Sequence, residues 1–123
     1  MPLQDSLFVI DSVTPTEQGV RYTLRLQAHH AIYRAHFPQH PITPGVCLVQ
    51  IAVELAEHYL RRPLRLSQAK NIKFLAVLSP EATPIVYYHL TRLQITDNLL
   101  SMQATVMFSD TIFAKLSLLC FLL

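Results

Sequence analysis

The sequence has few charged residues and no long apolar run. Charged residues make up 15% of its 123 residues, hydrophobic residues make up 51%, and glycine occurs only twice. No stretch of 18 uncharged apolar residues exists, which argues against a membrane-spanning helix. The length predicts a single domain over residues 1–123. Such a small apolar domain has more hydrophobic surface than it can bury, which predicts a subunit interface.

Cysteines are scarce, and several functional signatures are missing. Cys47 and Cys120 form neither a disulfide framework nor a metal-ligand spacing. Both lie in apolar surroundings, where a buried thiol is commoner than a bridge, so we expect a cytoplasmic protein. The first residues lack the basic stretch and apolar core of a signal peptide. We expect no metal and no cofactor. The net charge of +2 is too small to indicate a nucleic-acid partner. No Gly-x-Ser-x-Gly elbow is present to support a serine nucleophile.

The first half of the chain contains a predicted hairpin and a predicted loop. Residues 7–13 and 20–27 are rich in strand-forming residues and flank a turn at 17–19. Residues 28–45 contain three prolines, at positions 38, 41 and 44. We expect this segment to be an extended, rigid loop without a helix, because proline inside a helix removes a hydrogen bond.

The rest of the chain predicts one helix and four strands. Residues 46–60 are apolar on almost every side and contain no glycine or proline, which indicates a buried helix. Four strand-like runs follow, at residues 69–78, 85–95, 99–108 and 112–122. The order of two strands, a helix and four strands predicts an α+β fold in which one antiparallel sheet wraps around the helix.

A motif with fixed proline spacing precedes the helix. It reads His36-Phe37-Pro38, then Pro41, then Pro44-Gly45-Val46. This motif resembles that of the FabA/FabZ-type 3-hydroxyacyl-acyl-carrier-protein dehydratases, and the segment 70–80 is similar to the next strand of that family. The resemblance implies the hotdog fold, with an antiparallel sheet around one long central helix. It also implies a homodimer that binds an acyl thioester and acyl carrier protein.

Dehydration of a 3-hydroxyacyl thioester needs a base, a donor to the thioester carbonyl and an acid for the departing hydroxyl. His36 suits the role of base, because imidazole exchanges protons near neutral pH. Gly45 and Val46 lie where the chain enters the helix, and free N–H groups there stabilise developing enolate charge. The resemblance implies the same role for a main-chain N–H at this turn.

The acid is where the sequence departs from the family. Family members place a glutamate or aspartate near the first turn of the helix, and the matching residue here is Gln50, which cannot give a proton. Glu54 lies four residues further, on the same helix face. Three interpretations are open: His36 acts as both base and acid with Gln50 orienting the hydroxyl, Glu54 takes part, or dehydration is lost. We favour the first.

Other predicted contacts surround this motif. Tyr33 and Phe37 are candidates to line the acyl channel, although Tyr33 could equally pack against the helix. Arg61, Arg62 and Lys70 belong to a basic cluster that either contacts the carrier protein or is simply a solvated face. The predicted function is dehydration of 3-hydroxyacyl-acyl carrier protein to the trans-2-enoyl product, in fatty-acid or polyketide/polyene-type synthesis. The alternatives are a thioesterase of the same fold and a catalytically impaired, acyl-binding partner subunit.

Overall fold

A computed structural model describes residues 2–123, which form two helices and six strands. The two helices are α1 (Ala31–Ala35) and α2 (Gly45–Leu60). The strands are β1 (Phe8–Thr16), β2 (Gly19–Leu26), β3 (Leu64–Phe74), β4 (Ile85–Thr96), β5 (Leu99–Phe108) and β6 (Thr111–Leu122). All six strands belong to one antiparallel sheet with the order β1-β2-β4-β5-β6-β3. The predicted single sheet is therefore confirmed.

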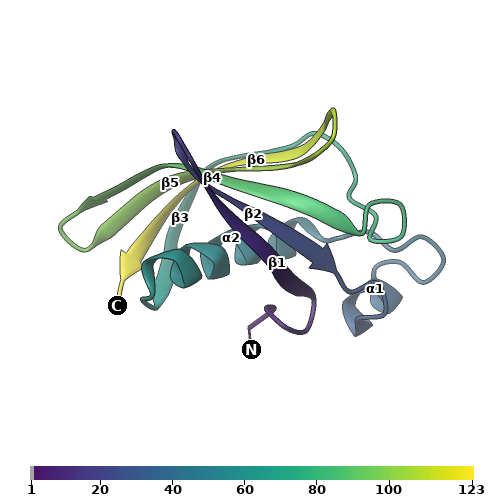
Figure 1. Ribbon diagram of the computed structural model, residues 1–123. Coiled ribbons are helices and arrows are strands. Elements are labelled where there is room, and N and C mark those ends of the chain that lie inside the picture. Colours follow the sequence, from purple (N-terminus) through teal and green to yellow (C-terminus); the bar gives the residue numbers. More distant parts are fainter. Residues whose placement is uncertain (1) are drawn as a thin grey trace.

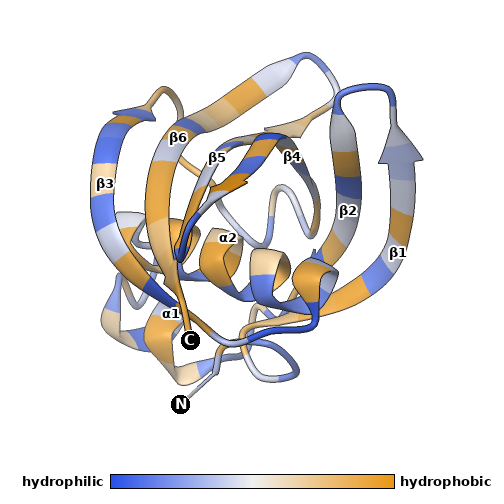
Figure 2. Cartoon of the chain, turned by 90° about the vertical axis from the view of Figure 1, so that its left-hand side faces the viewer, coloured by the Kyte–Doolittle hydropathy of each residue, from blue (hydrophilic) through white to orange (hydrophobic). Residues whose placement is uncertain are grey.

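The sheet curves around α2, which fills its concave side (Figure 1). Figure 2 shows β3 on one side of α2 and β1 on the other, with the remaining strands between them. Nine of the 16 residues of α2 are buried, from Cys47 to Ala56. The inward side chains of β2, β4, β5 and β6 alternate with exposed ones and complete the core, as the pleat requires. The predicted arrangement of one sheet wrapped around a central helix is confirmed.

The ends of α2 follow from local sequence. Pro44 is the N-cap residue, a place where a missing N–H costs nothing. The helix interior contains no proline. The C-cap residue that ends the helix is Arg61, whose φ of 54° lies in the left-handed region. The N–H of Arg61 donates to the carbonyl oxygen of Glu57, which satisfies one of the last free carbonyl groups. The helix predicted over 46–60 is thus confirmed to within one residue.

Two local predictions were wrong. Residues 28–45 do contain a short helix, α1, which begins after the N-cap residue His30 and ends at Ala35, before the C-cap residue His36 and Pro38. The Nδ1 atom of His30 accepts a hydrogen bond from the N–H of Ile32 and caps this helix. A proline disfavours helix only at its own position and just before it, so the residues upstream are free to coil.

The strand predicted at 69–78 is displaced by several residues. β3 starts at Leu64 and ends at Phe74, and it pairs with β6 along its whole length. Two irregularities in register interrupt its alternation of polar and apolar residues. The sequence pattern therefore does not predict the first half of this strand. Residues 75–78 leave the sheet, and the carbonyl oxygen of Leu78 accepts a hydrogen bond from the N–H of Thr43.

Two buried tyrosines hold α2 against the sheet. The hydroxyl of Tyr88 donates to the carbonyl oxygen of Leu48 at 3.0 Å, and the hydroxyl of Tyr22 lies 2.8 Å from Nδ1 of His58. Burial raises the pKa of Tyr22 to about 12 and raises the pKa of Tyr88 well above its usual value. Both groups therefore stay neutral, as structural hydrogen-bonding groups. Within residues 2–123, neither helix is long and apolar enough to cross a membrane.

Candidate active site

His36 lies directly after α1, in a loop that closes on itself. The N–H of Ile42 donates to the carbonyl oxygen of His36 at 3.0 Å, and Nδ1 of His36 lies 3.4 Å from the carbonyl oxygen of Ile42. The ring also stacks on that of Phe37, with 4.3 Å between the centroids. Because a carbonyl oxygen can only accept, this contact favours the tautomer with the proton on Nδ1. In that tautomer of the neutral ring, Nε2 has the free lone pair that a base requires.

The imidazole of His36 shares one pocket with the start of α2. The pocket has a volume of about 210 Å³ and is mostly apolar. Its lining consists of His36, Ile42, Thr43, Pro44, Gly45, Leu48, Phe74, Ala76, Val77 and Leu78. None of these residues carries a carboxylate. The structure thus brings together the predicted base and the predicted glycine turn, without an acid from the same chain.

The N-terminal end of α2 provides the hydrogen-bond donors of this pocket. The N–H groups of Cys47 and Leu48 donate to the carbonyl oxygen of Pro44 at 3.0 and 3.1 Å. The N–H groups of Gly45 and Val46 come before them and have no helical carbonyl to reach. Gly45 lines the pocket, whereas the side chain of Val46 is 76% exposed and points away from the core. Gly45 is therefore the residue of this pair that forms part of the pocket wall.

Phe74, at the end of β3, is a pocket residue that the sequence analysis did not select. A Cβ atom added to Gly45 would lie 2.6 Å from the Cζ atom of Phe74, well inside van der Waals contact. The absence of a side chain at Gly45 thus makes room for this aromatic ring. The signal that could have identified Phe74 is its place in the segment that resembles the dehydratases.

The contact between Gly45 and Phe74 leads to a prediction about stability. Gly45→Ala is expected to lower the free energy of unfolding, because the new methyl group displaces the Phe74 ring. In a Phe74→Ala background the same change should be neutral or stabilising, since alanine then gains its higher helix propensity without a clash. Urea unfolding of the four proteins should give a coupling free energy of about 1 kcal/mol. Additive effects would contradict this packing.

Gln50 and Glu54 form a pair on one face of α2, as their spacing predicts. The Nε2 atom of Gln50 donates to Oε2 of Glu54 at 2.9 Å. The Glu54 side chain is buried, and both carboxylate oxygens accept hydrogen bonds from the N–H of Leu3, at 2.9 and 2.8 Å. Oε1 also accepts from the N–H of Gln4 at 2.8 Å. Glu54 thus anchors the N-terminal segment and holds Gln50, and it does not line the pocket of His36.

The remaining predicted site residues lie in different places. Tyr33 is buried, and its hydroxyl lies 2.9 Å from Oγ1 of Thr43, so it stabilises the loop that contains Thr43. It is not a lining residue of the His36 pocket. Arg61 and Arg62 follow the C-terminal end of α2, about 24 Å along the axis from Gly45 at 1.5 Å per residue. Lys70 is exposed on β3. A carrier-protein contact at these three basic residues stays a prediction.

Comparison with known proteins identifies the family. A family model described as "ApeI-like: ApeI dehydratase" matches residues 12–110. This supports the dehydratase class, whereas the narrower FabA/FabZ assignment stays a prediction. No curated protein matches the sequence.

Solved structures resemble the chain over almost its whole length. One is a chain of the dehydratase heterocomplex ApeI:P from Xenorhabdus doucetiae, with 18% identity, a TM-score of 0.66, and coverage of 92% of this chain and 96% of that one. An uncharacterized protein from Erwinia carotovora subsp. atroseptica shares 20% identity, with a TM-score of 0.61 and coverage of 94% and 92%. A conserved protein from Pseudomonas aeruginosa shares 18% identity, with a TM-score of 0.56 and coverage of 91% and 89%. These likenesses confirm the predicted hotdog fold.

Proposed function

This chain belongs to the ApeI-like dehydratase family, and from that premise we propose that it dehydrates 3-hydroxyacyl groups on acyl carrier protein to trans-2-enoyl groups. The observation that carries the proposal is the pocket shared by His36 and Gly45. The C2 proton of a thioester becomes removable when the carbonyl oxygen can take up negative charge. A base and a carbonyl donor must therefore lie within one substrate's reach.

In the proposed reaction, the thioester carbonyl oxygen accepts a hydrogen bond from the N–H of Gly45. The Nε2 atom of His36 removes the proton from C2, and the electron pair of that C–H bond forms the C2–C3 double bond. The C3–O bond breaks, and His36 returns its proton to the departing hydroxide. The products are an enoyl thioester and water, and His36 regains its starting tautomer. This sequence suits a pocket without a carboxylic acid.

Gln50 is proposed to orient the 3-hydroxyl group from the neighbouring subunit. Its side chain is exposed and lies outside the His36 pocket of its own chain. Because Nε2 donates to Glu54, Oε1 of Gln50 is left as a hydrogen-bond acceptor for the substrate. An acceptor at this position can bind the substrate O–H but cannot protonate it. The amide therefore positions the leaving group while His36 supplies the proton.

The surface beside the pocket supports an assembly of two subunits. β3 is an edge strand, so within residues 2–123 one side of its backbone has no strand partner in the sheet. Leu66 and Phe74 pair with the buried Cys120 and Ala114, yet they are 39% and 54% exposed on the side of the sheet that faces α2. Half-exposed apolar side chains on an inner face indicate a surface that a second hotdog chain covers.

We expect sedimentation velocity to give a homodimer, with twice the 14.0 kDa mass of one chain. The Xenorhabdus doucetiae relative was solved as a heterocomplex, so the partner could instead be a different hotdog chain. A purified protein that stays monomeric, and dimerises only when such a chain is added, would favour the alternative of an acyl-binding partner subunit. The measurement thus separates the two assemblies.

The proposed function is tested by two signals followed together. The protein is incubated with 3-hydroxyacyl thioesters and, in the reverse direction, with enoyl thioesters. Enoyl absorbance and free thiol are recorded in the same sample. Enoyl formation without thiol release is the expected result. Thiol release without enoyl formation would indicate a thioesterase and overturn the proposal. If neither signal changes, for the homodimer or for the complex, the proposal is also overturned and only acyl binding is left.

A further inference from the structure

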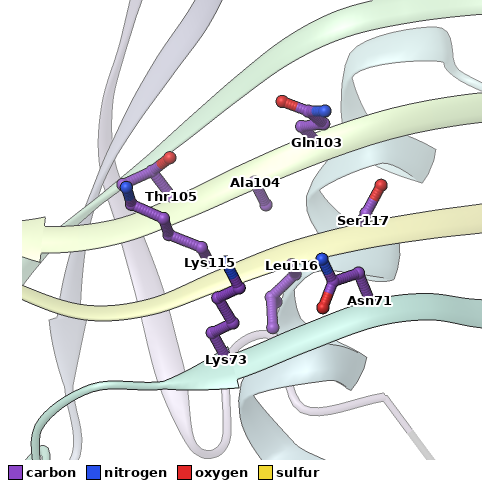
Figure 3. A pocket seen from close by; sticks show the side chains of 8 residues that line it. All are labelled: Asn71, Lys73, Gln103, Ala104, Thr105, Lys115, Leu116 and Ser117. Carbon is purple, nitrogen blue, oxygen red and sulfur yellow. The ribbon is translucent and has the colours of Figure 1, made fainter.

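The outer face of the sheet, opposite α2, contains a second polar pocket. Strands β3, β6 and β5 run side by side there, and Lys73 pairs with Lys115, which pairs with Thr105. Side chains two positions further along the strands face the same way and form a neighbouring row. That row consists of Asn71, Ser117 and Gln103. Figure 3 shows both rows projecting from the same side of the three strands, with α2 behind them.

The two rows enclose a shallow pocket of about 170 Å³, whose lining is completed by Ala104 and Leu116. Its rim carries two ammonium groups, two hydroxyl groups and two amides. No lining residue is acidic. Each of the polar side chains can donate a hydrogen bond. The pocket is therefore chemically suited to a small anion.

The positions of Lys73 and Lys115 are electrostatically unfavourable when no ligand is bound. Like charges directly opposite one another on adjacent strands repel. The ion pair found within residues 2–123 joins Arg25 to Asp11, so neither lysine has a carboxylate partner in this part of the chain. A bound anion would relieve the repulsion and accept a hydrogen bond from both ammonium groups.

The row of Lys73, Lys115 and Thr105 continues beyond the pocket. Thr105 pairs with His89 on β4, and His89 pairs with Arg21 on β2. These two side chains already have partners, since His89 Nε2 lies 2.9 Å from Oγ1 of Thr16 and the Arg21 guanidinium lies over the ring of Tyr87. The two lysines are thus the members of the row left to bind a ligand.

We propose that this outer pocket binds a phosphate-type oxyanion, either free phosphate or a phosphate monoester. A tetrahedral oxyanion offers acceptors in several directions, which matches ammonium, hydroxyl and amide donors converging from three strands. The site is separate from the dehydratase pocket. Lys73 faces outward, whereas the next residue, Phe74, faces Gly45 on the inner side of the sheet. Pairing of two subunits along β3 would form main-chain hydrogen bonds in the plane of the sheet, so Lys73 would still face outward.

The test is a titration of the full-length protein with inorganic phosphate at low ionic strength. Amide chemical shifts are followed by NMR, and chloride at matched ionic strength is the control for screening. We expect shifts centred on Ser117, Gln103 and Thr105. Lys73→Met and Lys115→Met should each weaken binding about tenfold, since each removes a charge-assisted hydrogen bond. Methyl phosphate is titrated in parallel: tighter binding than phosphate identifies a monoester as the ligand, and weaker binding identifies free phosphate.

Lys70→Met is the matched control. It removes the same charge from the same strand, but Lys70 does not line the pocket. Its affinity for phosphate should stay within about twofold of the unmodified protein, as for a screened surface charge. Equal losses in Lys70→Met and Lys73→Met would mean that only net charge matters, and would overturn the proposal. So would shifts that chloride reproduces. These binding measurements do not depend on enoyl formation, so the phosphate site and the dehydratase function can each be contradicted without the other.

Discussion

His36→Ala is expected to lower kcat/KM for enoyl formation by about 10²–10⁴-fold, the usual contribution of a general acid–base group. The loss should lie near the upper end, because His36 is proposed both to remove the C2 proton and to protonate the hydroxide. Among the described residues, no other titratable side chain lines the pocket to replace it. The measurement is enoyl absorbance with a 3-hydroxyacyl thioester, at substrate concentrations that define kcat/KM.

His40→Ala is the control for the loop. His40 lies four residues further in the same loop, is exposed, and does not line the pocket. It should therefore retain enoyl formation, and both variants should unfold at similar temperatures. His36→Asn adds a second check, because an amide can still donate to the carbonyl oxygen of Ile42 but cannot accept the C2 proton. Activity retained in both His36 variants would rule out the proposed base.

Glu54→Leu is expected to cost about 2–4 kcal/mol of the free energy of unfolding, because it removes charge-assisted hydrogen bonds and leaves partly buried N–H donors unpaired. The carboxylate now accepts hydrogen bonds from the N–H groups of Leu3 and Gln4. Leucine has a similar volume but no acceptor. Detachment of the N-terminal segment into water would limit the loss. Urea unfolding, followed by circular dichroism, measures the change.

Glu57→Leu is the matched control on the same helix. Glu57 accepts a hydrogen bond from the N–H of Leu64 at 2.8 Å and is only half-buried, so its loss should be smaller. In Glu54→Leu, enoyl formation should fall less than in His36→Ala, because Gln50 loses its orientation while the base is intact. If Glu54→Leu keeps full stability but abolishes activity as completely as His36→Ala, then Glu54 acts in catalysis and not as an anchor.

The match between sequence and structure differs from element to element. The helix 46–60 and the strand 99–108 were predictable because each has a strong pattern, continuous apolarity in the first and clean alternation in the second. β3 was misplaced because its two irregularities break the alternation, and because an edge strand is held by backbone hydrogen bonds to β6. α1 was missed because its five residues are too few to show a period.

By itself, the sequence determined an antiparallel sheet around one helix, the motif around His36 and Gly45 whose family resemblance implies the hotdog fold, and the shared helix face of Gln50 and Glu54. The motif and the helix face depend on residues close together in the chain, whose spacing sets which side chains can meet. Only the tertiary structure decided what Glu54 binds and which ring covers Gly45. Leu3 lies 51 residues from Glu54, and Phe74 is 29 positions from Gly45, so no local pattern could reveal these contacts. Long-range packing gives Glu54 a structural role, and it leaves His36 as the one titratable side chain in its pocket among residues 2–123.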